Sequence, residues 1–584
     1  MCGIIAYNGS DDAIPYLLDG IKNLEYRGYD SFGCALESDG GLTIKKDIGR
    51  IDDVINEYKL RDLSSKKAVF HTRWATHGGV EQKNAHPISD CTGRLAVAHN
   101  GIIENWTDLR DELSGHIIKS DTDTEVLAHI IENRLNAGDD LTSAVKFTFE
   151  RINGSSSFVV IDTKTDNLVG VKKGSPLVLG LADKGNFISS DVPSFIKYTN
   201  KVVYLYDGDM VSVGKKDYEI VNLMGKDHTH DIATANLSSK DIDKGDYEHF
   251  MLKEIMEQPN LIKNLKDKEF KEVDEAAAVI RGASSVYIIG AGTSFHVARL
   301  GARVFRENGI NAIPVQGHDL PSYKKVISDK DVFIIISQSG ETADIINSMH
   351  IIKNNKKIGI INNEGSTLAK EVGIFIPVGA GPEKAVAATK TFTLSSFYIV
   401  LVAMAAVGKK DLAVNDINLL NVNLYNLFVP SVIDAVNAVA GKIKDLESIF
   451  LLGRDLDYVL ALEGALKFKE TTYIHAEAVD ASTFKHGPLA LISDKAYAIS
   501  LVSEPLRTSM LSNLHEVKAR RGNVIGISDT NSELFDMFIR TPEGGMFSFI
   551  SQAIILQLLS YKTAVLKGID MDHPRNLAKT VTVL

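Results

Sequence analysis

The stretch SSVYIIGAGTS, residues 284–294, determines the fold class of the larger part of this chain. Its continuous apolar run ends in a glycine turn and a helical pattern follows, which is typical of a strand buried on both faces in a parallel sheet. The pattern returns about 165 residues later as ESIFLLGRDLD, residues 447–457. Two further pairs of segments have a similar offset, namely DVFIIISQSGET with AYAISLVSEPLR and KKIGIINNEG with GNVIGISDTN. We therefore predict two duplicated, doubly wound α/β domains.

The rest of the chain divides around this repeat. Residues 2–225 hold short β-rich runs such as GIIAYNG, KAVFHTRWATHG, LAVAHNGII and VVYLYDGDMVSV, which predict an α+β domain. The polar residues 226–245 have the composition of a linker. We place the two α/β domains at residues 246–420 and 421–567, and a C-terminal tail rich in polar groups at residues 568–584.

Composition limits the function classes. The 64 Lys and Arg residues against 75 Asp and Glu residues make the formal charge −11, which argues against a nucleic-acid binder that relies on a general basic field. The three cysteines show no CxxC pair, so neither a disulfide framework nor a zinc site is predicted, and the reducing cytoplasm is the expected compartment. The start of the chain does not resemble a signal peptide, and we interpret the apolar residues 392–408 as a buried helix.

Cys2 follows the initiator Met1, so removal of Met1 would leave cysteine with a free α-amino group. That amine titrates at roughly 7.7–8 and can take up the thiol proton, so one residue would supply both nucleophile and base. The alternative is that Cys2 is a small apolar residue that begins an edge strand. Asn100 and Gly101 follow the apolar run LAVA, where an amide and a backbone N–H can form an oxyanion hole.

Two charged residues complete a pocket for a free amino acid. Arg73 offers a bidentate partner for a carboxylate, and Asp123 offers a partner for an α-ammonium group. Taken singly, Arg73 is also compatible with a surface ion pair, and Asp123 with the helix cap that SDTDTEV suggests. The combination is what predicts an amino-acid site.

The motifs MCGI, LEYRGYDS, HTRWATHG, NAHP, AHNGIIEN and SDTDTE together resemble the glutamine amidotransferase domain of the N-terminal nucleophile class. The resemblance implies an αββα sandwich that hydrolyses glutamine to glutamate and ammonia. It implies Cys2 as nucleophile and Asn100 and Gly101 as oxyanion hole, with the glutamine surrounded by Arg73, Trp74, Thr76, His77 and Asp123. Several enzymes share this domain, so the acceptor of the ammonia stays open at this point.

The repeated half carries the features of a phosphate site. GAGTS and SQSGET both lie between a strand and a helix, where free N–H groups and the hydroxyls of Thr293, Ser294, Ser337, Ser339 and Thr342 can surround a phosphate. Structural capping of the two helices is the alternative. Neither turn has the spacing of a Walker loop or of a dinucleotide fingerprint, which disfavours ATP and NAD.

Titratable groups gather in the second unit. Glu463, Lys467 and Glu470 have helical spacing and share one face, where an exposed ladder of ion pairs is the alternative to a catalytic role. His486 lies in a Gly-Pro turn, and Lys579 in the tail has apolar neighbours that can desolvate its amine for reaction with a carbonyl.

The motifs GAGTS, SQSGET, GPEKAVAATKTFT, ALEGALKFKE, YIHAEA, KHGP and DHPRNLAKTVTV resemble the isomerase half of the glucosamine-6-phosphate synthase family, which consists of two sugar-isomerase (SIS) domains. The segment YEHFMLKEIMEQP also looks like this family's. The resemblance implies conversion of fructose 6-phosphate and glutamine into glucosamine 6-phosphate and glutamate, the first step of hexosamine (UDP-GlcNAc) biosynthesis. It implies ammonia channelled between domains, no metal or organic cofactor, no nucleic-acid or membrane partner, and a homodimer or larger homo-oligomer.

The resemblance also implies roles for individual residues. Lys579 would form an imine at C2 of the sugar, Glu470 would move a proton from C1 to C2 with Lys467 nearby, and His486 would open the ring from the neighbouring subunit. The phosphate and sugar would be held by Ser337, Gln338, Ser339, Thr342, Thr293, Ser294, Val386 and Ala387.

Two positions depart from the family pattern. Ser482 and Thr483 stand where Gly-Glu is usual before KHGP, and Asp455 stands where the family commonly reads LGRG. The alternatives to synthesis are an amidotransferase for another phosphosugar and a catalytically silent regulator that binds sugar phosphate. The regulator predicts loss of Glu470, His486 or Lys579, yet all three are present.

Overall fold

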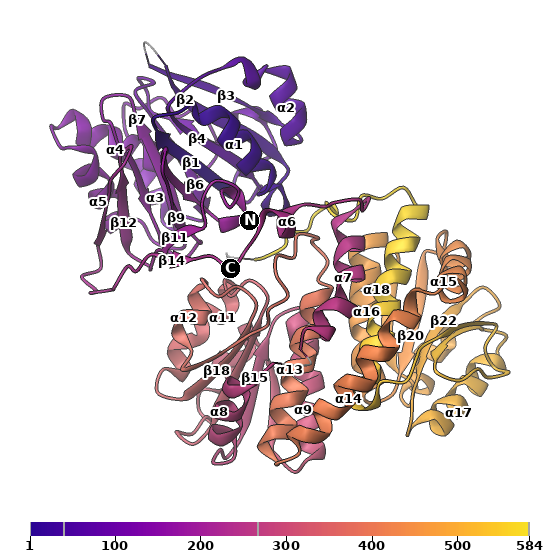
Figure 1. Ribbon diagram of the computed structural model, residues 1–584. Helices are drawn as coiled ribbons and strands as arrows, with labels where there is room; N and C mark the ends of the chain where they lie inside the picture. The colour runs from indigo at the N-terminus through magenta and orange to yellow at the C-terminus, as the bar shows by residue number, and fades with distance from the viewer. Residues whose placement is uncertain (1, 39–40, 266–267, 582–584) are drawn as a thin grey trace.

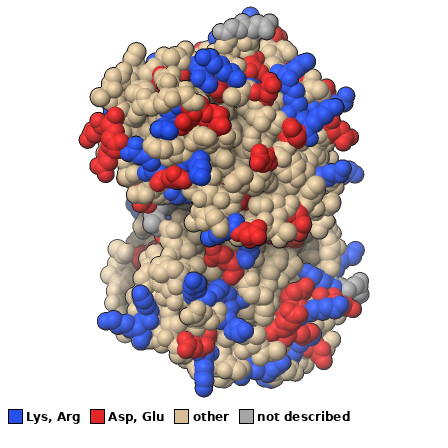
Figure 2. All heavy atoms as spheres, turned by 90° about the vertical axis from the view of Figure 1, so that its left-hand side faces the viewer, with Lys and Arg blue, Asp and Glu red and all other residues tan. Residues whose placement is uncertain are grey.

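The computed structural model describes residues 2–38, 41–265 and 268–581. Figure 1 shows one lobe made from the N-terminal part of the chain and two α/β units beside it. In Figure 2 acidic and basic side chains are interspersed over the face drawn there, as the nearly balanced charge composition leads one to expect.

The N-terminal lobe has four layers. Helices α1 (Ala13–Lys22) and α2 (Ile51–Glu57) pack on one antiparallel sheet, and α4 (Glu125–Asn136) and α5 (Leu141–Arg151) pack on another. A third apolar core, which includes Ile4 and Val159, lies between the two sheets. The first sheet has the order β14 (Ala233–Thr234), β11 (Lys201–Tyr204), β9 (Val178–Ala182), β10 (Gly185–Ser189), β1 (Gly3–Gly9), β4 (Lys67–Arg73), β2 (Ser31–Ser38) and β3 (Gly41–Ile48). The second has the order β13 (Tyr218–Asn222), β12 (Asp209–Val213), β8 (Leu168–Val171), β7 (Ser156–Asp162), β6 (Leu95–Gly101) and β5 (Ile88–Ser89). The predicted αββα sandwich is therefore confirmed.

Two details of this lobe go beyond what the sequence predicted. The run VVYLYDGDMVSV is not one strand, because a turn at Gly208, whose φ is +90°, sends β11 and β12 into different sheets. The polar residues 226–245 are not irregular throughout, since β14 pairs with β11 and helix α6 (Ser239–Ile242) follows.

The two α/β units repeat one topology. The first parallel sheet has the order β16 (Ala312–Gln316), β15 (Val286–Gly290), β17 (Val332–Ser337), β18 (Lys356–Ile361) and β19 (Ile374–Pro377). The second has the order β21 (His475–Asp480), β20 (Ser448–Gly453), β22 (Tyr497–Val502), β23 (Asn523–Ser528) and β24 (Met537–Arg540). Each quoted sequence pair occupies the same strand of its own sheet, so the predicted duplication is confirmed.

Long helices, which lie between the two sheets in Figure 1, join the two units around one continuous apolar core. They include α7 (Phe250–Lys263), α8 (Lys271–Ile280), α9 (Thr293–Glu307), α13 (Lys390–Ala406), α14 (Lys410–Asn423), α15 (Pro430–Ile443), α16 (Leu456–Thr472) and α18 (Ser548–Leu566). All residues of α13 are buried, which confirms the buried helix predicted there. In the described part of the chain, the segment Gly545–Leu566 is long and apolar enough to cross a membrane, but 83% of its apolar window is buried inside the protein.

Candidate functional site

Cys2 lies at the start of β1 and faces a cavity of about 70 Å³. Its Sγ accepts a hydrogen bond from the backbone N–H of Trp74 at 3.3 Å. Trp74, Thr76, Asn100 and Gly101 line the same cavity. The strand order places β4 beside β1 and brings these separate sequence motifs around one thiol. Met1, whose removal the nucleophile requires, lies outside the described residues.

Asn100 is oriented by its neighbours. Its Nδ2 donates to the carbonyl of Cys2 at 3.1 Å and to Ser190 Oγ at 2.8 Å, and its Oδ1 lies 3.2 Å from Nε2 of His71. Burial lowers the pKa of His71 to about 3, so this ring is neutral at pH 7. Gly101 has φ +136°, and a Cβ there would lie 1.9 Å from the carbonyl oxygen of Ser155. The backbone at the candidate oxyanion hole therefore requires glycine.

Arg73 and Asp123 are buried rather than placed on the surface. The Arg73 guanidinium, 3% exposed, donates to the carbonyls of His77, Gly78 and Gly79, and burial lowers its pKa. The alternative of a surface ion pair is therefore wrong. Asp123 accepts from the N–H of Ile103 at 2.8 Å, whereas Thr124 is the N-cap of α4, so the cap alternative is wrong as well. Arg73, His77 and Asp123 are absent from the lining of the small cavity beside Cys2.

A second cavity, of about 320 Å³, lies between the first α/β unit, α16 of the second unit and the C-terminal tail. Most of the predicted sugar-phosphate residues line it, namely Thr293, Ser294, Ser337, Gln338, Ser339, Thr342 and Val386, together with Glu470 and Lys579. Three other predicted residues do not. Ala387 is fully buried behind the wall, Lys467 is buried next to Glu470, and His486 is exposed on the surface of the second unit.

The serine-rich turn after β17 keeps hydroxyl protons free for a ligand. Ser337 Oγ accepts from the N–H of Gly340, and Ser339 Oγ accepts from the N–H of Glu341. A hydroxyl that accepts in this way can still donate its own proton. The turn can therefore present several donors to one anionic group, as a phosphate requires.

The face of α16 that carries Glu463, Lys467 and Glu470 is buried against the first unit, so the exposed-ladder alternative is wrong. Lys467 Nζ lies 3.3 Å from a carboxylate oxygen of Glu463 and 2.7 Å from one of Glu470. Burial alone would favour the neutral amine, but the two carboxylates raise the pKa of Lys467 above its ordinary value. Glu463 also accepts from Thr293 at 3.0 Å and contacts His296 at 2.7 Å.

Lys579 pairs with a carboxylate that sequence reasoning missed. Its amine donates to Glu383 at 2.5 Å and to the carbonyl of Ala385 at 2.8 Å. Burial opposes ionisation of Glu383, but the Lys579 charge outweighs it and lowers the pKa of Glu383. Glu254 of α7 accepts from the N–H groups of Lys384 and Ala385 nearby. Both carboxylates stand in quoted motifs, GPEKAVAATK and YEHFMLKEIMEQP, but no spacing rule pairs them with a lysine in the tail.

The tail separates the two cavities. Ala578, Thr580 and Val581 line the small cavity beside Cys2, and the same residues line the larger cavity with Lys579 between them. The tail is anchored on both sides: the carbonyl of Val581 accepts from the N–H of Ala343, and the carbonyl of Leu577 accepts from Tyr29 at 2.7 Å. The tail therefore forms part of the wall of both candidate sites.

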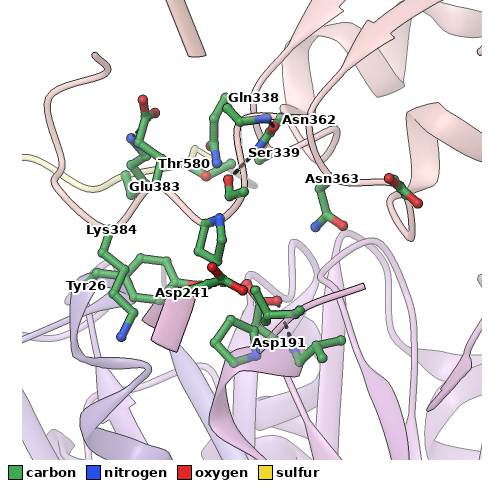
Figure 3. A pocket seen from close by; sticks show the side chains of 18 of the residues that line it. Tyr26, Asp191, Asp241, Gln338, Ser339, Asn362, Asn363, Glu383, Lys384 and Thr580 are labelled. Carbon is green, nitrogen blue, oxygen red and sulfur yellow. Dashed lines mark hydrogen bonds and ion pairs between the residues drawn. The ribbon is translucent and has the colours of Figure 1, made fainter. Parts of the chain in front are cut away.

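A third cavity, of about 590 Å³, opens between the lobes and continues the sugar-side wall. Figure 3 shows Gln338 and Ser339 of the α/β unit on one side of it, with Tyr26 and Asp191 of the N-terminal lobe on the other. Gln338, Ser339, Lys579 and Thr580 line both this cavity and the sugar-side cavity.

The two departures from the family pattern have different surroundings. Asp455 has φ +57° and its carboxylate pairs with Arg303 of α9. Ser482 donates to Asp480, and Thr483 is exposed beside His486. Neither position lines the sugar-side cavity.

Comparison with known proteins agrees with this geometry. The glutamine amidotransferase domain family matches residues 71–197, and the SIS domain family matches residues 279–405 and 442–566. The glutamine–fructose-6-phosphate aminotransferases (isomerizing) of Pyrococcus horikoshii and Aquifex aeolicus are 39% and 38% identical to this chain, each over the full length of both proteins. Among solved structures, the C-terminal domain of glucosamine-fructose-6-phosphate aminotransferase from Francisella tularensis matches with 30% identity and a TM-score of 0.53, covering 57% of this chain and 100% of its own.

The fold and these matches define the class of protein: an N-terminal glutamine amidotransferase domain joined to two SIS domains. Because the full-length similarity extends over both halves in the same order, the chain belongs to the family of isomerizing glutamine–fructose-6-phosphate aminotransferases.

Proposed function

We propose that this protein converts D-fructose 6-phosphate and L-glutamine into D-glucosamine 6-phosphate and L-glutamate, the first step of hexosamine biosynthesis. One observation carries the proposal: the tail that places Lys579 in the wall of the same sugar-sized cavity as Glu470 also forms part of the wall of the cavity beside Cys2. A site that releases ammonia from glutamine and a site that consumes ammonia are suited to one coupled reaction when they share a wall. We assign the glutaminase domain to residues 2–225, the linker to residues 226–245, the SIS domains to residues 246–420 and 421–567, and the catalytic tail to residues 568–584.

In the glutaminase half, the α-amino group of Cys2 takes the proton of the Cys2 thiol, and the resulting thiolate attacks the side-chain carbonyl of glutamine. The α-ammonium group then returns the proton to the amide nitrogen, which leaves as ammonia. Nδ2 of Asn100 and the N–H of Gly101 stabilise the oxyanion, and the collapse of the tetrahedral intermediate releases ammonia. Water then hydrolyses the thioester to glutamate. Arg73 holds the α-carboxylate of glutamine and Asp123 holds its α-ammonium group, with Trp74, Thr76 and His77 around the glutamine side chain. To bind the carboxylate, the Arg73 guanidinium gives up its hydrogen bonds to the backbone carbonyls of Gly78 and Gly79.

In the isomerase half, the hydroxyls of Ser337, Ser339 and Thr342, with Gln338, hold the phosphate. Thr293, Ser294 and Val386 form the sugar-binding walls, and the buried Ala387 supports them from behind. Lys579 leaves Glu383 and attacks C2 of the open ketose, and water leaves as the imine forms. Ammonia displaces the lysine. Glu470 then moves a proton from C1 to C2, and Lys467, which is held as a cation between two carboxylates, positions Glu470 rather than serving as the nucleophile.

Ring opening requires a residue from elsewhere. His486 is exposed and does not line the cavity of its own chain, which supports its delivery from a second subunit. We therefore propose a homodimer or larger homo-oligomer in the cytoplasm. We also propose that ammonia crosses the tail between the two cavities, because protonated ammonium in water is not a nucleophile.

The test is product analysis with amide-¹⁵N glutamine and fructose 6-phosphate in excess unlabelled ammonium at pH 7. We expect glucosamine 6-phosphate that retains the label, and no glutamine-dependent product from Cys2→Ala. Dilution of the label to the level of the external ammonium would contradict the channel. Binding of fructose 6-phosphate without any amino sugar product would instead favour the silent regulator, and product only with a different phosphosugar would favour the other amidotransferase.

A further inference from the structure

Among the residues that the structure describes, four metal-ligating side chains converge in the glutaminase domain, away from the site described above. They are Cys91, which follows β5, His116, in the loop after α3 (Trp106–Asp111), and His129 and Glu132, one turn apart on α4. Cys91 Sγ, Nδ1 of both imidazoles and Oε2 of Glu132 all lie within 4.8 Å of one another. Three of these four side chains are nearly inaccessible to solvent: His129 is 1% exposed, Glu132 is 7% exposed and His116 is 10% exposed.

The spacing of these donor atoms fits a single small cation. A tetrahedral zinc with ligand distances of about 2.0–2.3 Å has donor atoms about 3.3–3.7 Å apart. Here Cys91 Sγ lies 3.3 Å from Nδ1 of His116 and 3.6 Å from Nδ1 of His129. Glu132 Oε2 lies 2.9 and 3.0 Å from the same two nitrogens, so these two edges would open by a few tenths of an ångström around an ion.

The outer nitrogens are arranged as metal-bound histidines require. Nε2 of His129 lies 2.8 Å from a carboxylate oxygen of Glu125, and Nε2 of His116 lies 2.9 Å from Oδ1 of Asn133. An Nε2–H that donates to such an acceptor leaves Nδ1 unprotonated and facing the centre of the cluster. Glu125 is itself held by the N–H groups of Lys119 and Ser120.

We propose that Cys91, His116, His129 and Glu132 form a closed four-ligand site for a structural divalent transition metal, and that zinc is the ion. One thiolate, two imidazoles and one carboxylate form a donor set that suits zinc better than magnesium or calcium, and four protein ligands leave no open position for catalysis. The site ties three separate segments together. The loop between His116 and His129 contains Asp123, so the metal would also fix the loop that carries this part of the proposed glutamine pocket.

The test is the metal content of the full-length protein after production with zinc and dialysis without chelator, measured by inductively coupled plasma mass spectrometry. We expect about one zinc per chain in the wild type and less than about a tenth of that in Cys91→Ala and His129→Gln. Cys34→Ala, which changes a cysteine of β2 in the same domain, is the matched control and should keep the metal. Chelation should lower the melting temperature of the wild type and leave that of Cys91→Ala unchanged.

A ligand exchange keeps the proposal testable if the alanine variant does not fold. Reconstitution with Co²⁺ should produce a sulfur-to-cobalt charge-transfer band in the wild type, and Cys91→His should bind the ion without that band. A wild-type protein that holds less than about a tenth of an equivalent of zinc or cobalt would overturn the site and leave a network of ion pairs. An equal metal content in the wild type, Cys91→Ala and His129→Gln would show that the metal is bound adventitiously and would overturn the site.

Discussion

At the scale of single residues, two neighbouring buried carboxylates, Glu383 and Glu254, lie close to the tail residue Lys579. Glu383 is held as an anion by Lys579, and its charge acts on Glu254, whose nearest donors are backbone N–H groups. Burial and then the charge of Glu383 raise the pKa of Glu254 from 4.5 to about 8. One carboxylate is therefore kept ionised and the other protonated at neutral pH.

This difference predicts a pH-dependent stability. Between about pH 4.5 and pH 8 the folded protein keeps the Glu254 proton while the unfolded chain loses it, so the free energy of unfolding falls as the pH rises through this window. Glu254→Gln removes the titrating group, so its stability should not fall in this window. The difference in melting temperature between the variant and the wild type should therefore increase from pH 5 to pH 8 by several degrees, since each kcal/mol of unfolding free energy corresponds to about 2–4 °C. Differential scanning calorimetry measures the gain. Parallel curves of melting temperature against pH for Glu254→Gln and the wild type would contradict the assignment.

At the scale of elements, the duplicated strand–turn–helix unit keeps its backbone geometry although its residues have changed. Gly292 begins α9 with φ 54° and ψ −127°, and Asp455 begins α16 with φ 57° and ψ −117°. Only glycine adopts this region readily, so Asp455 is strained. Its carboxylate pairs with Arg303 of the other unit, which offsets part of the strain.

Substitution separates the strain from the ion pair. Asp455→Ala and Asp455→Gly both lose the pair with Arg303, but only glycine relieves the backbone. The glycine variant should therefore be more stable than the alanine variant by about 1 kcal/mol, after allowing for the entropy of glycine in the unfolded chain. Thermal unfolding of the two full-length variants gives the difference. Equal melting temperatures would mean that the turn relaxes and that Asp455 carries no strain.

At the scale of the whole molecule, the proposed active site is divided between segments far apart in the sequence. Ser337 and Thr342 come from the first SIS domain, Glu470 from the second and Lys579 from the tail, whereas His486 is exposed and does not line their cavity. Under the proposed function, a second copy of the chain would supply His486 to this site.

Subunit complementation tests this division. His486→Ala and Lys579→Ala should each abolish synthesis, and a mixture refolded or exchanged to equilibrium should regain about a quarter of the wild-type rate, because half the dimers are mixed and each has one complete site. The rate of glucosamine 6-phosphate formation measures the recovery. Glutaminase activity with glutamine alone is the folding control for both variants. No recovery in a mixture shown by native mass spectrometry to contain mixed dimers would rule out delivery of His486 from the partner subunit.

Local sequence signals, the apolar runs and strand-end turns, determined an α+β lobe and the duplicated parallel sheets. The αββα arrangement and most of the candidate site residues followed from the resemblance of the motifs to a known family. The sequence could not determine which elements meet. Helical spacing groups Glu463, Lys467 and Glu470 on one face but does not say that the face is buried. The β-rich run VVYLYDGDMVSV does not reveal that Gly208 divides it between two sheets. The pairing of Lys579 with Glu383, the tail shared by two cavities and the convergence of Cys91 with His116, His129 and Glu132 were decided only by tertiary structure, because packing brings together donors and carboxylates that no sequence period relates.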